Sequence, residues 1–162
     1  MEDGCNMKRT LYIIIGLIAA TCLSCKKDES VADIKTVAQE VVGEWHLIKE
    51  TCEGVPVEST AEVYLHIKAD SSFELYQKSG TQTRFYMFNG TCYSEDGKLI
   101  GQYNDGTSWG AVYLVTFADG KMILSTFDKM GEMTFESKSL SVEEKNNANI
   151  AVKSSAAESP IL

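Results

Sequence analysis

The chain has 162 residues and is acidic, with 23 aspartates and glutamates against 15 lysines and arginines and a formal net charge of −8. Binding to nucleic acid needs clustered cations on the protein surface, so this balance argues against a nucleic-acid partner. It also argues against binding anionic lipid head groups by charge alone. The length suits one domain in addition to a targeting segment.

The N-terminal segment has the layout of a secretory signal peptide. Lys8 and Arg9 precede an apolar run over 11–20, and this run is too short to span a bilayer. Residues 1–6 carry two acidic side chains, the wrong charge for the start of a signal, so we expect Met7 to be the biological start.

The run leads to Leu23-Ser24-Cys25, which resembles the lipobox of a bacterial lipoprotein signal. The resemblance implies that residues 1–24 are removed and that Cys25 receives a diacylglyceryl group, with fatty acids such as palmitate as the anchor. More than one acyl chain anchors a protein stably in the lipid bilayer. Cys22 is the alternative lipid site, although Thr21 is a less typical residue to precede it.

The tether that follows also has a recognisable composition. Lys26-Lys27-Asp28-Glu29 resembles a surface-export signal of some Gram-negative lipoproteins. We therefore expect a bacterial outer-membrane lipoprotein, with surface exposure and the periplasm-facing leaflet both left open. Within residues 25–42, Val31, Ile34, Ala38 and Val41 recur at helical steps, which predicts one short amphipathic helix ending near Gly43.

From residue 43 to about 140, short runs rich in β-branched and aromatic residues alternate with turn signals. Val63, Leu65 and Ile67 lie on one face of such a run, and Asp96-Gly97 and Asp119-Gly120 favour tight type I′ hairpins. Asp105-Gly106 is a third signal of the same kind. We predict an all-β fold, an eight-stranded antiparallel up-and-down barrel preceded by the short helix. The expected strands are 44–51, 62–68, 72–78, 84–93, 98–104, 110–118, 121–127 and 132–138.

Gly43-Glu44-Trp45 opens the first expected strand directly after the helix. This position resembles the Gly-x-Trp motif of the lipocalin superfamily, and 43–138 resembles the small lipocalin-like domains of bacterial lipoproteins. The resemblance implies that Trp45 packs across the closed end of the barrel and that Gly43 lets the backbone turn there. The later Thr-Asp-Tyr signature and the closing Arg motif of large secreted lipocalins are missing, so the resemblance does not imply retinoid or haem binding.

The candidate binding residues are aromatic. Side chains with an apolar body and a polar tip suit lipid or sugar ligands, although they also serve as ordinary barrel filling. The possible ligand-lining residues are Tyr64, Tyr76, Tyr86, Phe88, Tyr103, Trp109 and Tyr113. Arg84 is a candidate for a carboxylate ligand or a surface ion pair.

Catalysis and metal binding have weak support. His46 and His66 are the two histidines, and neither has a partner at metal-ligand spacing. A Gly-x-Ser-x-Gly elbow is missing. We expect a protein that is not an enzyme and that uses no cofactor and no metal.

Two further expectations concern the mature chain. Cys52 and Cys92 are either a disulfide, closing a loop of about 40 residues in an oxidising compartment, or two buried free thiols. The polar segment 141–162 is expected to be a disordered tail, with a frayed strand over 149–152 as the alternative.

The expected function is binding of a small apolar or amphipathic ligand in the barrel. The alternative is a filled barrel that docks an envelope protein as an inhibitor or accessory module. An open interior favours the first, and a filled interior with an exposed apolar patch favours the second.

Overall fold

The computed structural model describes residues 35–59, 61–153 and 159–162. The predicted lipid site Cys25, its alternative Cys22 and the first part of the predicted helix lie outside these residues. Within the described ranges, no helix has both the length and the apolar character needed to cross a bilayer.

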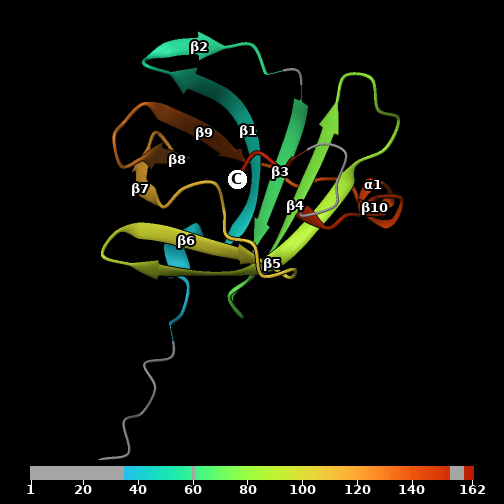
Figure 1. The fold of residues 1–162 in the computed structure, drawn as a ribbon, viewed down its shortest axis with the longest axis horizontal. Helices are drawn as coiled ribbons and strands as arrows, with labels where there is room; N and C mark the ends of the chain where they lie inside the picture. The colour runs from blue at the N-terminus through green and yellow to red at the C-terminus, as the bar shows by residue number, and fades with distance from the viewer. Residues whose placement is uncertain (1–34, 60, 154–158) are drawn as a thin grey trace, which may run out of the picture. The chain divides into compact units, whose positions relative to one another are not determined.

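The fold is a closed, eight-stranded antiparallel barrel, as predicted (Figure 1). Each barrel strand pairs with the next along the chain, and the last pairs with the first. The barrel strands are β1 (Gly43–Cys52), β3 (Ala61–Ile67), β4 (Ser72–Ser79), β5 (Tyr86–Glu95), β6 (Lys98–Tyr103), β7 (Tyr113–Ala118), β8 (Lys121–Thr126) and β9 (Gly131–Ser137).

Period-two alternation places the apolar residues inside the barrel. Val63, Leu65 and Ile67 of β3 are completely buried, together with Phe73 and Leu75 of the neighbouring strand. Since alternate residues of a strand point to the same face, one run of β-branched and aliphatic residues is enough to line the interior. The opposite face of β3 and β4 carries polar and aromatic side chains.

Two of the three predicted Asp-Gly turns form as expected. Asp96-Gly97 and Asp119-Gly120 have positive φ at both residues, the geometry of the predicted type I′ turns. At Asp105-Gly106 only the glycine has positive φ. Here the chain does not turn straight into the next strand, and β7 begins at Tyr113 instead of residue 110. The residues between form a loop that carries Trp109 into the core.

The sequence did not predict the short strand β2 (Val55–Val57), which pairs back onto β1 through a turn at Glu53-Gly54.

The prediction of a helix before the barrel is wrong for the described part of that segment. Residues 35–42 contain only the 3-10 turn η1 (Gln39–Val41). The backbone is instead held by the barrel, because the amide of Ala38 donates to Ser94 Oγ at 2.9 Å and that of Val37 to Ser71 Oγ at 3.1 Å.

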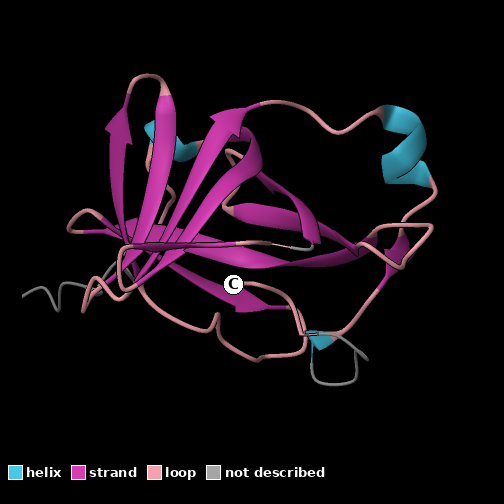
Figure 2. Ribbon diagram, turned by 90° about the horizontal axis from the view of Figure 1, so that it is seen from above, coloured by secondary structure: helices cyan, strands magenta, loops and turns pink. Residues whose placement is uncertain are grey.

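The prediction of a disordered tail is also wrong for the described part of 141–162. This region forms helix α1 (Val142–Asn146) and strand β10 (Asn149–Ile150), which pairs in parallel with β5. Figure 2 shows α1 beside the strands, outside the barrel wall. Ser141 caps α1 by accepting from the amide of Glu144 at 3.2 Å, and its hydroxyl donates to the Glu144 carboxylate at 2.6 Å. This N-cap and the side-chain hydrogen bond beside it stabilise a helix too short to form alone.

The side chain of Trp45 is buried beside η1, the turn that precedes the barrel. Its indole is 8% exposed, and Nε1 donates to the carbonyl of Val41 at 2.9 Å. Gly43 has φ +156°, a backbone conformation that residues with a side chain rarely adopt, so glycine suits this position.

We expect Trp45→Ala to lower the free energy of unfolding by about 3–5 kcal/mol, the usual cost of truncating a buried aromatic residue. Trp45→Phe keeps a ring and loses the hydrogen bond to Val41, so its cost should be smaller. Urea denaturation of the two variants measures the difference. An unfolding midpoint unchanged by Trp45→Ala would contradict a packing role for this residue.

Candidate functional site

The predicted ligand-lining residues divide into two groups on opposite sides of the barrel wall. One group lies in the interior core and the other on the outer face of β3 and β4. The interior group is Phe88, Tyr103, Trp109 and Tyr113. The outer group is Tyr64 and Tyr76, which pack with Phe85 and Leu140. Tyr86, at the start of β5, is 36% exposed and belongs to neither cluster.

Strand periodicity explains this division. Tyr64 lies between Val63 and Leu65, both of which point inward, so its own side chain points outward. Tyr76 follows inward-pointing Leu75 in the same way. A binding site inside the barrel therefore has access to only the first group.

The interior aromatic cluster is built around Trp109. The Phe73 ring lies 5.1 Å from the Trp109 ring and 5.4 Å from that of Tyr103, and both pairs meet edge to face. Tyr113 contacts the other side of Trp109 at 6.1 Å. The indole approaches the backbone of β6 so closely that a Cβ at Gly101 would lie 2.1 Å from it. Glycine at this position lets the loop after β6 place Trp109 inside the barrel.

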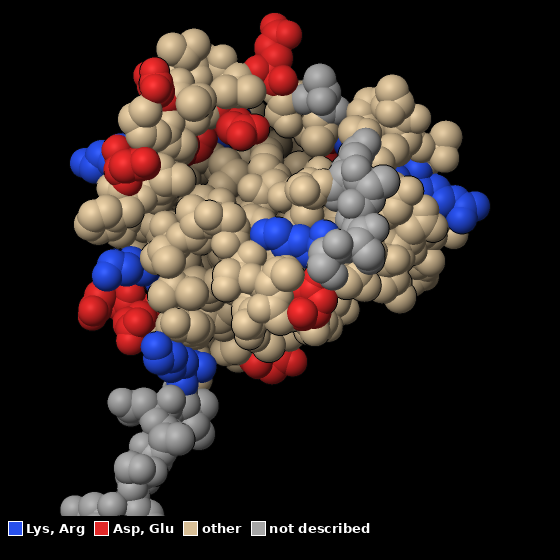
Figure 3. Space-filling view, viewed as in Figure 1, with Lys and Arg blue, Asp and Glu red and all other residues tan. Residues whose placement is uncertain are grey.

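Part of the segment 159–162 also lies in this interior. Leu162 is 1% exposed and belongs to the same core cluster as Trp109, and Pro160 is buried. In Figure 1 the end of the chain lies within the ring of strands. Figure 3, seen from the same direction, shows a hollow on this face that is lined mostly by uncharged atoms. Sequence reasoning missed this segment, because a short apolar end after a polar stretch has no periodicity to reveal it.

Polar groups hold the segment in place. The Tyr103 hydroxyl donates to the main-chain oxygen of Leu162 at 2.8 Å, and Lys153 Nζ donates to the same oxygen at 3.2 Å. Gln77 of β4 accepts from the amide of Ile161 at 3.0 Å and donates to the carbonyl of Ser159 at 3.3 Å.

Burial sets the protonation of these groups. It raises the pKa of Tyr103 well above the ordinary tyrosine value of 10, so the phenol stays protonated and remains a hydrogen-bond donor. Burial also lowers the pKa of Lys153, against a smaller opposing effect of Asp105. Trp109 Nε1 is buried and makes no hydrogen bond to any described residue. The interior thus combines apolar walls with three nitrogen or oxygen donors.

A second polar region lies on the outer face of the barrel, where α1 contacts β1. Lys145 Nζ of α1 contacts Glu44 Oε1 at 2.7 Å. His66 Nδ1 lies 3.5 Å from Glu74 Oε2 and 3.9 Å from Glu44 Oε1. The Tyr76 hydroxyl donates to Glu74 Oε2 at 3.1 Å, so this network joins α1 to the barrel wall.

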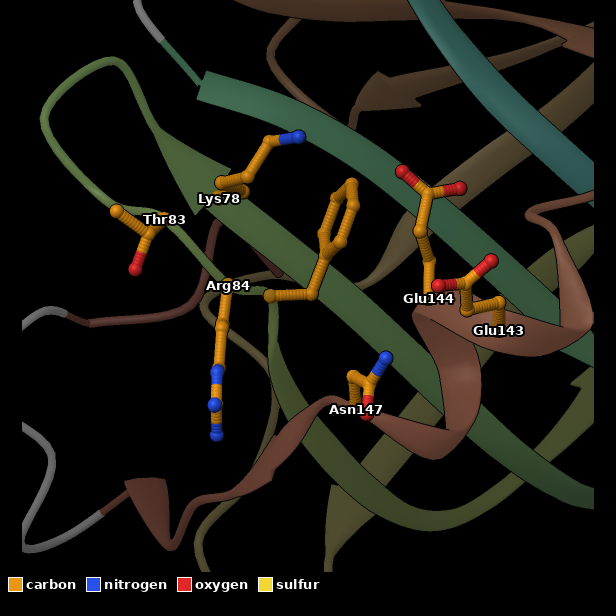
Figure 4. Close-up of a pocket in the computed structure, with 7 residues that line it drawn as sticks. Lys78, Thr83, Arg84, Glu143, Glu144 and Asn147 are labelled. Carbon is orange, nitrogen blue, oxygen red and sulfur yellow. The ribbon is translucent and has the colours of Figure 1, made fainter.

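Arg84 lies at a surface pocket of about 260 Å³ between α1 and the connection from β4 to β5 (Figure 4). Lys78 and Arg84 extend away from each other in this view, and Glu143 and Glu144 lie across the pocket from them. Lys78 Nζ stacks over the Phe85 ring at 4.3 Å and pairs with Glu62 at 2.9 Å. The cations therefore do not converge on one point where a carboxylate would bind.

The cysteines and histidines serve no common site. Cys52 and Cys92 are free thiols and are not bridged in the structure. Cys92 is buried, as the alternative of two buried thiols requires, but Cys52 is exposed, so that alternative is wrong for Cys52. Burial raises the pKa of Cys92 to about 12, which leaves its thiol protonated. His46 pairs with Glu136 at 3.2 Å and stacks on Tyr64. No group of three His, Cys, Asp or Glu side chains suited to a metal ion occurs in the part of the chain that the structure describes.

The geometry defines the class of fold, a closed all-β barrel with an aromatic interior. No protein-family model matches the chain, and no curated protein matches its sequence. Among solved structures, the chain is similar to a lipoprotein, YedD from Klebsiella pneumoniae, with 13% sequence identity and a TM-score of 0.44. The match covers 70% of this chain and 86% of the other.

The network under α1 predicts sensitivity to acid. Burial tends to raise the pKa of Glu44, but hydrogen bonds from Lys145 and Ser139 outweigh it and hold the pKa below its ordinary value of 4.5. The pKa of Glu74 is lowered in the same way, by Lys68 and Tyr76 against its own burial. A carboxylate with a lowered folded-state pKa stabilises the fold above its unfolded pKa, and this contribution is lost as the pH falls through the folded value.

We therefore expect the free energy of unfolding to fall as the pH drops below about 4.5, the ordinary glutamate value. Glu44→Gln should reduce this pH dependence, because it removes the carboxylate that pairs with Lys145. Glu143→Gln, on the exposed side of α1, is the control and should leave the dependence unchanged. Urea unfolding between pH 6 and pH 3 measures both variants, and equal slopes for Glu44→Gln and the unaltered protein would contradict the assignment.

Proposed function

We propose that this protein is a lipid-anchored lipoprotein of the bacterial envelope whose lipocalin-like barrel binds one small apolar or amphipathic ligand. The observation that carries the proposal is the position of Pro160 and Leu162. Both are buried and Leu162 belongs to the interior core cluster, although neither residue belongs to a barrel strand. The interior is filled in the structure, and this segment fills part of it, so release of the segment would leave room for a ligand of similar size.

The chemistry of the interior supports this role. Eight strands enclose a space for packed side chains or one small ligand, and ligand sites are mostly apolar with a few placed polar groups. Trp109, Tyr113 and Phe73 supply the apolar walls, while Tyr103 and Lys153 supply donors at one position. We propose binding without catalysis, since these donors suit a ligand oxygen and no nucleophile lies beside them in the described contacts.

Anchoring at Cys25 is the second part of the proposal and rests on the signal sequence. A thiol at the end of a signal is the lipid acceptor, and Ser24 suits the residue before the cleavage site better than Thr21 does. We expect Cys25→Ser to abolish lipidation and membrane retention. Cys22→Ser is the matched control and should mature normally.

Intact mass analysis and membrane fractionation of the expressed protein follow both variants. A mature protein that begins at Cys22 would contradict the assignment of Cys25. The outer membrane is the compartment that we propose, and the two leaflets are distinguished by protease accessibility in whole cells.

Ligand binding is tested by native mass spectrometry of the mature protein purified from the envelope, before and after extraction with organic solvent. We expect an adduct that extraction removes. Tyr103→Phe removes the interior donor and should lower ligand occupancy, by roughly threefold to tenfold for one lost hydrogen bond. Tyr64→Phe is the matched control, because it removes a hydroxyl that donates to Glu62 on the outer face.

Absence of an adduct from the unaltered protein, or equal loss in both tyrosine variants, would contradict binding inside the barrel. A role as a docking module for an envelope protein is then favoured. Its specific support is a set of exposed apolar side chains on two neighbouring turns, linked by the hydrogen bond from Glu53 N to Met130 O. These side chains are Val55 at 64%, Val57 at 42%, Phe127 at 76% and Met130 at 45% exposure.

A further inference from the structure

The segment Ser159–Leu162 is recognised mainly through its backbone. Gln77 uses both atoms of its side-chain amide, one on the carbonyl of Ser159 and one on the amide of Ile161. Tyr103 and Lys153 then bind the main-chain oxygen of Leu162. Four hydrogen bonds to backbone groups of three residues are the contacts expected for an extended peptide.

The side chains of the segment meet matching surroundings. Leu162 is 1% exposed within the core cluster, Pro160 is buried, and Ile161 packs against the cluster from its edge. Ser159, the first of the four, is exposed. The site thus selects apolar residues in the last positions and tolerates a polar residue at the entrance.

We propose that the barrel interior is a binding site for an extended apolar peptide segment, and that Ser159–Leu162 occupies this site as an internal competitor. This inference rests on the proposed function and names its ligand class. Gln77 hydrogen-bonds to the peptide backbone, and Tyr103 and Lys153 donate to the main-chain oxygen at the position of Leu162. The wall around Trp109 contacts the apolar side chain at that position.

Several observations point to a built site rather than chance packing. Lys153 Nζ is held over the Tyr103 ring at 4.7 Å and also donates to the carbonyl of Ser108 at 2.8 Å, so it is positioned before any ligand arrives. The partly buried ammonium has fewer water contacts than a surface lysine, and it favours an oxygen or an anion beside it. Buried Trp109 Nε1 is a further donor without a partner among the described residues.

An alkyl chain with a carboxylate fits this site less completely than a peptide. It would fill the apolar wall and accept from Tyr103 and Lys153, but it would leave both atoms of the Gln77 amide without their present partners. The contacts at Gln77 therefore favour a peptide.

Competition follows from the tether between the segment and the barrel. A ligand joined covalently to the protein that binds it has an effective concentration on the order of millimolar. A free peptide must exceed this value to displace it, and removal of the segment should therefore raise the apparent affinity for an added peptide.

The experiment compares the full chain with a chain that ends at residue 158, and it uses the synthetic peptide Ser-Pro-Ile-Leu as probe. The protein contains two tryptophans, Trp45 and Trp109, so NMR gives two indole N–H signals. Truncation should move the Trp109 signal and leave that of Trp45, which reports that the barrel remains folded. Addition of peptide should return the Trp109 signal toward its position in the full chain.

Loss of Leu162 from the core makes the truncated chain less stable, so a second variant is included. Leu162→Asp in the full chain replaces the buried apolar side chain with a charge and should release the segment without shortening the protein. In either background, Tyr103→Phe should weaken peptide binding by roughly threefold to tenfold. The peptide Ser-Pro-Ile-Asp is the control and should not bind.

Saturable binding of Ser-Pro-Ile-Leu to the truncated chain and to Leu162→Asp, at least tenfold tighter than to the full chain, supports the inference. Equal affinity in all three proteins, or an unmoved Trp109 signal, overturns it.

Decanoate, an alkyl chain with a carboxylate, is titrated in parallel. If decanoate moves the Trp109 signal and the peptide does not, the peptide site is overturned and the proposed binding of an amphipathic ligand stands. If neither probe binds any variant, both proposals are overturned.

Discussion

The hydrogen-bonded pairing of β1 with β9 is the constraint on which the rest of the structure depends. It joins the first and last barrel strands over Trp45 to Cys52 and Ser137 to Gly131, with a register shift between Leu47 and Lys49. Closure leaves no free edge among the barrel strands, and it converts one apolar sheet face into an enclosed interior. Without this pairing the inward row on β3 would face water, and the hydrophobic contribution to stability would be lost.

The closed barrel also has an outer face, and part of the chain after the barrel packs against it. The outer aromatic residues Tyr64 and Tyr76 are covered by the segment around α1, with Leu140 and Phe85 completing the cluster. Lys145 and Glu44 add an ion pair between helix and wall. This second, smaller core explains why a polar-looking stretch after the barrel is ordered, since its few apolar residues and its N-cap act together. It also removes two tyrosines from any role inside the barrel.

The interior is filled in an unusual way. Most of it is packed by strand residues, but one part is occupied by Trp109 from a loop and by Leu162 from the end of the described chain. Neither residue belongs to a strand, so neither is required to form the wall. The hydrogen bonds of Tyr103 and Gln77 to the backbone of residues 161 and 162 are the reason that a peptide is the ligand class that we propose.

The sequence by itself determined the local pattern of this protein. Alternation along 62–68 and the Asp-Gly turns at 96–97 and 119–120 predicted the strands, their order and the closed barrel, because period and turn geometry depend on near neighbours in the chain. The Ser141-Val142-Glu143-Glu144 run also held a capping signal that could have located α1.

Only the tertiary structure decided which aromatic residues meet. The inward or outward direction of Tyr64 was readable from Val63 and Leu65, but the approach of Trp109 to Gly101 and of Leu162 to Tyr103 was not. The helix predicted before Gly43 failed within 35–42 for the same reason, since Ser71 and Ser94 take the backbone hydrogen bonds of this segment. Contacts between residues tens of positions apart depend on how the closed barrel brings them together. The local sequence pattern does not specify such contacts.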